Sequence, residues 1–179
     1  TLINKQGVEI NHQYSKSYAF ESAFRDVISQ RISVDVDYFS LLRPFGEIAI
    51  TRRFAEMEEM HPVFSSCNRN FHQDGSHING RWCGDCPKCR FTALALAPFM
   101  TPAQLVGIQG ADLLDQKDQL AGFKSLCGID AEKPFECVGS VAECRAVVKF
   151  LANTGDWKQK FVISSLVDLP EIQASGELE

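Results

Sequence analysis

Apolar residues recur along much of this chain at helical rather than strand spacing. The clearest case runs from about Tyr18 to Arg31, after a serine, Ser17, of the kind that caps helices. Its apolar side chains recur at i, i+4, i+7 and i+8 and are Phe20, Phe24, Val27 and Ile28. We expect this stripe to face a core, and the pattern predicts a mostly helical protein.

Similar spacing and punctuation predict further helices. We expect a short helical turn beginning at Asp37 and ended by Pro44, and a longer helix over Glu47–Glu59. Farther along, the expected helices are Lys88–Ala97, one begun by Thr101-Pro102, Asp115–Cys127 with Gly128 as a left-handed terminator, and one near Trp157–Val167.

One segment reads as a strand followed by a helix. Pro134–Gly139 has turn residues on both sides and is the best strand candidate. Ser140 and Glu143 then form a capping box, and the inner face of the helix it begins is expected to be Cys144, Val147, Val148 and Leu151. Such a turn can place a helix N-terminus against an anion, although ordinary packing explains it as well.

Length and composition set the class of protein. The chain has 179 residues and is 45% hydrophobic, enough for a real core. No segment approaches the length of a membrane span and no secretory signal opens the chain, so we expect a cytoplasmic protein. Because the chain begins at Thr1 and enters motif-like sequence almost at once, we expect a piece of something longer. We predict one mostly helical domain over residues 1–179, mainly α with a few short strands.

Four cysteines carry the strongest chemical signal. Cys67 stands alone, and Cys83, Cys86 and Cys89 follow in the run Cys-Gly-Asp-Cys-Pro-Lys-Cys. This spacing predicts a closed tetrahedral zinc site, because Zn²⁺ binds four thiolates well and leaves no open position for catalysis. Gly84 gives such a turn the backbone freedom it needs. We therefore expect structural zinc that staples the fold.

Other interpretations of the cysteines stay open. A run of Cys-x2-Cys-x2-Cys also occurs at iron–sulfur sites with a remote fourth cysteine. Disulfides fit less well, because seven cysteines is an odd number and no secretory signal is present. His72 or His77 can replace a cysteine as ligand, but the turn residues around them favour an ordinary exposed loop.

The charge is unevenly placed. The net charge is −5, and the whole acidic excess lies after residue 110. This argues against a nucleic-acid partner, which needs clustered positive charge. A local basic group nevertheless surrounds the cysteines: Arg52, Arg53, Arg69, Arg81, Lys88 and Arg90. Acidic residues are interleaved with it, so the group is either a mixed solvated surface or a small anion pocket.

A polar segment precedes the first predicted helix. It comprises Asn11, His12, Gln13, Tyr14, Ser15, Lys16 and Ser17. Donors, an imidazole and a lysine at a helix N-terminus suit a carboxylate or a phosphate, because the helix dipole favours negative charge there. The alternative is a plain polar loop that ends in a capping serine.

Four segments together carry a family likeness: Asn11–Phe20, His61–Asn68, Arg81–Phe91 and Phe135–Ser140. They resemble the carboxy-terminal part of bacterial UDP-N-acetylmuramoyl-L-alanyl-L-glutamate epimerases, and the likeness runs through nearly all of the chain. The cysteine region is also similar, more distantly and only locally, to the zinc region of cyanodeazaguanine synthases, which are PP-loop ATP pyrophosphatases. The resemblance implies the carboxy-terminal portion of a larger α/β, PP-loop-like nucleotide-binding enzyme.

The first resemblance implies an ATP- and Mg²⁺-dependent epimerase of peptidoglycan precursor synthesis. Its substrate would be a UDP-linked muramoyl dipeptide whose terminal L-glutamate becomes D-glutamate. Converting the carboxylate to an acyl-adenylate makes the α-proton far more acidic, so activation would precede proton transfer. The plausible proton-transfer groups are His12, Cys137 and Glu136, although Cys137 also reads as a small buried strand residue. Residues expected to bind substrate are Asn11, His12, Tyr14, Ser15, Lys16, Ser17, Arg52 and Arg53.

The chain departs from that family in one respect. No Ser-Gly-Gly-x-Asp-Ser loop occurs in it, and neither of the common glycine-rich phosphate motifs does. If the resemblance holds, the nucleotide loop lies in an amino-terminal portion, and the isolated chain is expected to be inactive or to need that portion as a partner. The competing function is a zinc-stabilised module that binds protein or nucleic acid, with Trp82 placed to stack on a base or a partner.

Overall fold

The computed structural model describes residues 2–3, 5–6, 9–10, 14–71, 78–129 and 133–168. The chain divides into two compact units, one made of Thr1–Phe45 with Ser175–Glu179 and the other of Gly46–Ala174. A compact unit need not fold by itself, so the expectation of a single domain over residues 1–179 stays a prediction.

The first unit contains one long helix and a minimal pair of strands. Strands β1 (Leu2–Ile3) and β2 (Glu9–Ile10) are antiparallel, with Leu2 opposite Ile10. Helix α1 (Tyr18–Arg31) begins at Ser17, whose hydroxyl accepts the Phe20 N–H at 3.1 Å. The predicted helix and its cap are confirmed, and the described part of the chain is mainly helical.

The predicted core face of α1 is wrong in part. Ile28 is buried, but Phe24 and Val27 are exposed. Phe24 contacts two other rings of the first unit, stacking on Phe20 with ring centroids 5.6 Å apart and meeting Tyr38 edge-on at 4.9 Å. Periodicity shows which side chains share a face, and another layer must cover that face before it becomes core.

The most deeply placed polar group of the first unit is the Glu21 carboxylate. It accepts bonds from the Arg43 guanidinium, the shorter at 2.6 Å, and from the Ser40 N–H at 3.0 Å. The hydrogen bond from Arg43 is the main reason that the pKa of Glu21 lies below its usual range. The predicted helical turn from Asp37 to Pro44 is confirmed only in its second half, because turns occupy 41–44 and residues 37–40 have no regular structure. One reason is that the Ser40 N–H bonds to Glu21 and not to a preceding carbonyl.

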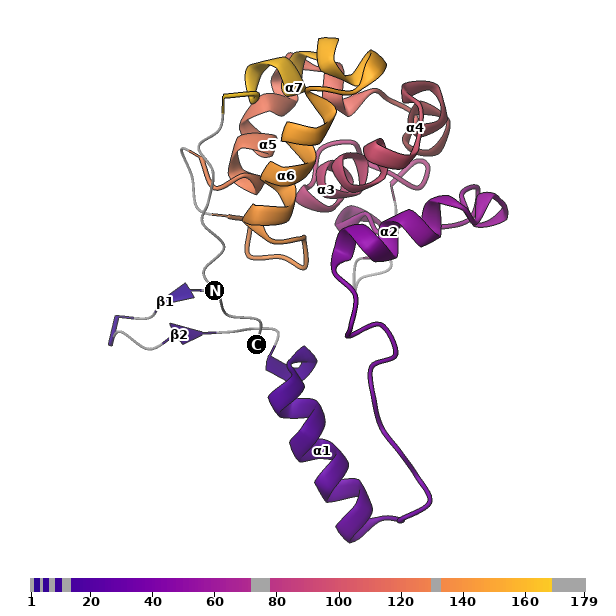
Figure 1. Ribbon diagram of the computed structural model, residues 1–179, viewed down its shortest axis with the longest axis vertical. Helices are drawn as coiled ribbons and strands as arrows, with labels where there is room; N and C mark the ends of the chain where they lie inside the picture. Colours follow the sequence, from indigo (N-terminus) through magenta and orange to yellow (C-terminus); the bar gives the residue numbers. More distant parts are fainter. Residues whose placement is uncertain are drawn as a thin grey trace. The chain divides into compact units, whose positions relative to one another are not determined.

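The second unit is a cluster of short helices around α3 (Pro87–Leu96). The helices that pack against α3 are α2 (Glu47–Ala55), α4 (Pro102–Gln109), α5 (Leu120–Leu126) and α6 (Val141–Leu151). Helix α7 (Phe161–Ser165) packs on α5, and this group of helices can be followed in Figure 1. Leu94 and Leu96 of α3 are almost completely buried, so α3 is the core helix of this unit.

Two capping boxes fix the starts of α4 and α6. The Thr101 hydroxyl accepts the Gln104 N–H while the Gln104 side chain returns to the Thr101 N–H. Ser140 and Glu143 do the same for α6. Both predicted helix starts are confirmed, and the predicted inner face of α6 is buried as expected: Cys144, Val147, Val148 and Leu151. The Glu143 carboxylate also accepts the Glu47 N–H at 3.0 Å, which links α6 to the start of α2.

Three predicted helices are shorter than expected. α2 stops at Ala55, where the N–H groups of Glu56 and Met57 bond three residues back. The predicted helix Asp115–Cys127 is regular only over Leu120–Leu126, because the backbone is extended at Gln116, next to the Asp115 carboxylate that accepts the Phe161 N–H. The predicted helix Trp157–Val167 is divided between a 3₁₀ segment, Gly155–Gln159, and α7. Gly128 has φ of +63°, so the predicted left-handed terminator is confirmed.

The predicted strand at Pro134–Gly139 is wrong. The Glu136 N–H bonds to the Pro134 carbonyl at 2.8 Å and the Val138 N–H bonds to the Glu136 carbonyl at 2.9 Å. These bonds span two residues and close tight turns, so this described segment has no partner strand. None of the helices in the described ranges has the length and apolar content that crossing a bilayer requires.

Candidate metal centre

The four predicted cysteine ligands come from two loops and one helix start. Cys67 precedes a 3₁₀ turn, Asn68–Asn70, and Cys83 lies in the bends before α3. Cys86 is the N-cap of α3, with Pro87 in its first turn, and Cys89 follows one turn later. Gly84 between them has φ of +71°, the left-handed conformation that favours glycine. The predicted motif is therefore a loop that ends in a helix cap.

The four sulfur atoms converge. All four Sγ atoms lie within 4.8 Å of one another. The Sγ of Cys86 is 3.4 Å from that of Cys89 and 4.0 Å from that of Cys67, and Cys83 and Cys89 are separated by 3.8 Å. Metal–sulfur bonds of about 2.3 Å in a tetrahedron place sulfurs about 3.8 Å apart. The cluster therefore has the dimensions for one tetrahedral metal ion.

Backbone N–H groups point at these sulfurs. Cys83 N–H donates to the Sγ of Cys67, Asp85 N–H to Cys83, and Cys89 N–H to Cys86, each at 3.4 Å. Such donors stabilise thiolate, which is the form that binds metal. Cys67, Cys86 and Cys89 are buried and Cys83 is half-buried, so water has little access to the ion position.

The cysteines of the cluster differ in the pKa of their thiols. The hydrogen bond between the sulfurs of Cys86 and Cys89 is the main reason that the pKa of Cys86 is lowered to about 4. The same bond, together with burial, raises the pKa of Cys89 above its usual value, and burial raises the pKa of Cys67. Cys86 is the first thiolate that the cluster offers to a metal.

The other three cysteines belong to different surroundings. All seven cysteines are free thiols, and the spacings in the cluster are far longer than a disulfide bond. Burial raises the pKa of Cys127 to about 11 and that of Cys144 to about 12, so both are neutral packing residues. His72 and His77, the alternative ligands, lie outside the described residues.

The basic residues near the cluster are largely paired. Asp85 binds Arg69 at 3.0 Å and Arg90 at 2.6 Å, and the Arg90 side chain also donates to Gln119 at 2.8 Å. On α2, Arg53 pairs with Glu56 and Arg52 is exposed. The mixed charged surface is therefore the better description of this group, and substrate binding by Arg52 and Arg53 stays a prediction.

Glu136 and Cys137 lie in the turns before α6. Both are half-buried, and one oxygen of the Glu136 carboxylate, Oε2, is buried without a hydrogen-bond partner. Burial, followed by the negative charge of Cys86, raises the pKa of Glu136. Because the predicted strand is absent from this described segment, Cys137 is not a strand residue. A role for Glu136 or Cys137 in proton transfer stays a prediction.

The polar segment before α1 is described only from Tyr14 onward. Asn11, His12 and Gln13 lie outside the described residues. Tyr14, Ser15 and Lys16 form an exposed 3₁₀ turn, the Lys16 carbonyl accepts from Arg43 at 3.2 Å, and Ser17 is used as the α1 cap. Substrate binding by these residues stays a prediction.

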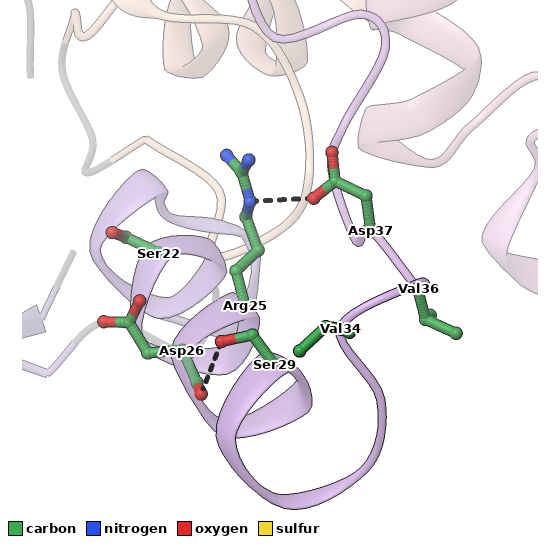
Figure 2. A pocket seen from close by; sticks show the side chains of 7 residues that line it. All are labelled: Ser22, Arg25, Asp26, Ser29, Val34, Val36 and Asp37. Atoms are coloured by element: carbon green, nitrogen blue, oxygen red, sulfur yellow. Dashed lines mark hydrogen bonds and ion pairs between the residues drawn. The ribbon is translucent and has the colours of Figure 1, made fainter.

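A surface hollow of about 450 Å³ also lies in the first unit, on α1 and the loop that follows it (Figure 2). Its lining residues are Ser22, Arg25, Asp26, Ser29, Val34, Val36 and Asp37. Every one of these side chains is exposed, Arg25 pairs with Asp37 at 3.1 Å, and the Ser29 hydroxyl donates to the Asp26 carbonyl. Because its polar groups already have partners or face water, this hollow does not select a ligand.

The sequence interpretation missed a second feature of the helical unit. Gln109 is buried at the end of α4, and it lines a surface hollow together with Trp82 and four glycines. The sequence feature that could have indicated it is a glutamine directly after the apolar run Leu105–Ile108, with glycines at 107 and 110. Trp82 is only 8% exposed, so its ring offers little surface on which a nucleobase could stack. Stacking by Trp82 was the main reason for considering a nucleic-acid-binding module, and this burial argues against it.

Known proteins resemble both parts of the chain. Residues 63–178 match the MurL C-terminal domain and residues 1–41 match the MurL N-terminal domain. A UDP-N-acetyl-alpha-D-muramoyl-L-alanyl-L-glutamate epimerase of Xanthomonas oryzae pv. oryzae is 46% identical over 159 residues, covering 89% of this chain and 35% of the relative. Relatives of the same name from Micromonospora and Salinispora tropica are 44% and 42% identical, each over 92% of this chain.

The chain spans roughly a third of the length of these curated relatives, with 35%, 37% and 36% of each covered. No solved structure matches it. The match to the C-terminal domain alone takes in well over half of the chain, and the four converging cysteines lie within it. By these matches, the chain belongs to the MurL epimerase family.

Proposed function

We propose that this chain is part of an enzyme that inverts the terminal L-glutamate of UDP-N-acetylmuramoyl-L-alanyl-L-glutamate to D-glutamate. The observation that carries the proposal is identity of 42–46% to relatives with that name, over about nine tenths of the chain. Matches to both MurL domain models support it. The activity belongs to the longer protein, because the chain accounts for only about a third of each relative.

The four-cysteine cluster is proposed to hold one zinc ion. Sulfur separations of 3.4–4.0 Å support a single tetrahedral ion. A [4Fe–4S] cluster binds each of its four cysteines to a different iron, and a [2Fe–2S] cluster binds two cysteines to each of its two irons, so four cysteines around either cluster cannot all lie as close together as around a single ion. With four protein ligands the ion has no open position, so its role is to hold the Cys67 and Cys83 loops against the start of α3.

Proton transfer at the glutamate α-carbon requires a group that can change its protonation state near neutral pH. Glu136 is the described candidate that the structure supports best, because its carboxylate is half-buried, has an unpartnered oxygen and has a raised pKa. His12 and Cys137 are the other candidates of the proposal. Epimerisation requires the proton to leave one face of the carbon and to return on the other, so two groups can share the work.

ATP and Mg²⁺ are proposed for the longer enzyme and not for this chain alone. The described residues supply no glycine-rich phosphate loop, and the arginines around the cysteines are mostly paired with carboxylates. The nucleotide site of the proposal, with its PP-loop, therefore belongs to the portion of the enzyme outside this sequence. We propose that portion as the chain's partner.

Exposed apolar side chains in the first unit support the proposal of such a partner. Apolar side chains of its loop are strongly exposed, among them Val34 at 84%, Leu41 at 74% and Ile32 at 71%. Ile28 is the one apolar side chain among residues 14–45 that is fully buried. A helix with so little apolar burial is marginal alone, and exposed apolar groups of this kind mark contact surfaces.

The test is deuterium exchange in the longer protein that contains this sequence. Purified enzyme is incubated in heavy water with the UDP-linked dipeptide, with and without ATP and Mg²⁺. We expect deuterium at the glutamate α-carbon and D-glutamate in the product only when ATP is present. Exchange without ATP would defeat activation before proton transfer, and no D-glutamate under either condition would defeat the proposed function.

Variants then assign the residues. Glu136→Gln, His12→Ala and Lys16→Ala should each slow epimerisation at least about tenfold, equivalent to about 1.4 kcal/mol. Glu59→Gln, at an exposed position on α2's downstream turn, is the control and should leave the rate unchanged. If a variant keeps the wild-type rate, the replaced residue has no part in the reaction.

A further inference from the structure

Exposed apolar side chains are concentrated in the first unit. In the described ranges, twelve of the nineteen large apolar side chains that are exposed lie between residues 14 and 45, although the helical unit is much the longer of the two. In the helical unit most apolar side chains instead enclose a core around α3. Soluble proteins seldom expose so many large apolar groups in so short a stretch, and such groups mark contact surfaces. The first unit therefore has apolar side chains but little core of its own.

One side of α1 is closed by polar bonds and the neighbouring side is open. The loop that follows α1 returns to it at Glu21, whose carboxylate accepts the Ser40 N–H at 3.0 Å and the Arg43 guanidinium at 2.6 Å. Phe24 and Val27 are three residues apart, so they share a face of the helix. Phe24 is 37% exposed and Val27 is 50% exposed. The loop is therefore bonded to α1 without covering this apolar face.

The loop also carries exposed apolar side chains on another side of α1. Val34 and Val36 line the same hollow as Ser22 and Ser29 (Figure 2). Ser29 is two residues beyond Val27, so these two positions do not share a face of the helix. Apolar groups are thus exposed in more than one direction. A segment enclosed on several sides by the rest of its domain has this distribution, whereas a finished surface with one partner has a single apolar patch.

The family matches indicate what encloses this segment. Residues 1–41 match the N-terminal domain and residues 63–178 the C-terminal domain, and the boundary between the two compact units, at Phe45 and Gly46, falls between the two matches. A segment of about 40 residues rarely folds without a disulfide, a metal or a partner, and no cysteine precedes Cys67 in this sequence. The chain covers only 35–37% of the relatives, so most of their length lies outside it.

We propose that residues 14–45 are a segment of the N-terminal domain, and that residues of the longer protein outside this sequence pack on Phe24 and Val27 to complete its core. That the longer protein has such a portion rests on the proposed function, whereas the apolar face and the boundary after Phe45 come from the described residues. A second copy of this chain fits less well, because a twofold interface uses one self-complementary patch and these side chains are exposed in more than one direction.

The test compares hydrogen–deuterium exchange of backbone amides in the 179-residue chain and in the longer protein that contains it, both loaded with zinc. We expect the amides of α1 from Phe24 to Arg31 to exchange at least about tenfold more slowly in the longer protein, because added packing opposes local opening. Amides of α3 and α6 should exchange alike in both and show that the helical unit is folded. Equal α1 rates in the two proteins overturn the proposal. Slower α1 exchange at higher concentration of the 179-residue chain makes a second copy the occupant and also overturns it.

Matched variants locate the contact. Val27→Lys puts a charge on the apolar face, but lysine has good helix propensity and suits the C-terminal half of α1, so it should change α1 exchange less than about twofold in the 179-residue chain. In the longer protein it should speed α1 exchange at least about tenfold, because an unpaired charge is costly to bury. The control is Val167→Lys, the same substitution at a valine 47% exposed in the helical unit, which should leave α1 exchange unchanged.

Each outcome decides the proposal separately from the epimerase reaction. If Val27→Lys has no effect in the longer protein, or the same effect in both proteins, nothing outside this sequence packs on Val27 and the proposal is wrong. An equal effect of Val167→Lys would mean general destabilisation and would also count against it. Protection of α1 that Val27→Lys removes supports the contact even if the longer protein makes no D-glutamate, and D-glutamate made by a protein with unprotected α1 would not rescue it.

Discussion

The close approach of Gly139 to Phe91 makes the sharpest stability prediction. A Cβ added to Gly139 would lie 2.5 and 2.7 Å from two ring atoms of Phe91, and 3.3 Å from the Glu143 carboxylate that caps α6. Phe91 belongs to the core of α3 and is 8% exposed. The ring therefore cannot swing away freely, and Gly139→Ala must displace either the core ring or the turn that begins α6.

The expected cost is that of overpacking, about 1–3 kcal/mol. The helical unit that contains both residues runs from Gly46 to Ala174. For a unit of about 130 residues, an unfolding entropy of about 2.1 cal/mol/K per residue converts this cost to a fall of about 4–11 °C in melting temperature. The measurement is thermal unfolding of the zinc-loaded chain followed by circular dichroism.

Gly107→Ala is the matched control. Its new Cβ meets no atom within 4 Å and its position is helical, so stability should stay level or rise by about 0.4–1 kcal/mol. Phe91→Leu should remove most of the conflict, so the double variant Gly139→Ala with Phe91→Leu should melt close to Phe91→Leu alone. If Gly139→Ala melts with the wild type, or its loss is unchanged when the ring is removed, the steric reasoning is refuted.

Further predictions concern the metal site and the Asp115 carboxylate. Metal analysis should find one zinc per chain; Cys86→Ser should lose zinc and melt far lower, whereas Cys144→Ala should keep zinc at a cost of about 1 kcal/mol, and equal losses would mean that the cysteines are sorted wrongly. The Phe161 N–H lowers the pKa of Asp115, so its contribution to stability should be present above pH 4 and lost as the pH falls through the folded pKa; Asp115→Asn should flatten this loss, and an unchanged acid profile would show that Asp115 is not responsible.

Local signals in the sequence predicted the parts of the fold that depend on near neighbours. Helix starts at Ser17, Thr101 and Ser140 were predictable because a cap bonds to an N–H only two or three residues away. Helix lengths were harder to predict. The predicted helix from Asp115 is interrupted where the Asp115 carboxylate bonds to Phe161, 46 residues farther along the chain. Periodicity alone contains no information about such a partner.

The candidate sites divide in the same way. The spacing of Cys83, Cys86 and Cys89 by itself predicted a cluster of thiols suited to a metal, because short Cys-x2-Cys turns and a helix cap bring these three together wherever the surrounding helices lie. Only the tertiary structure decided which buried polar groups remain unpaired. Trp82 and Gln109 come from separate elements, and their partners depend on how α3 and α4 pack against each other. A pairing between distant segments is a property of packing, so these atoms could be identified only after the helices were assembled.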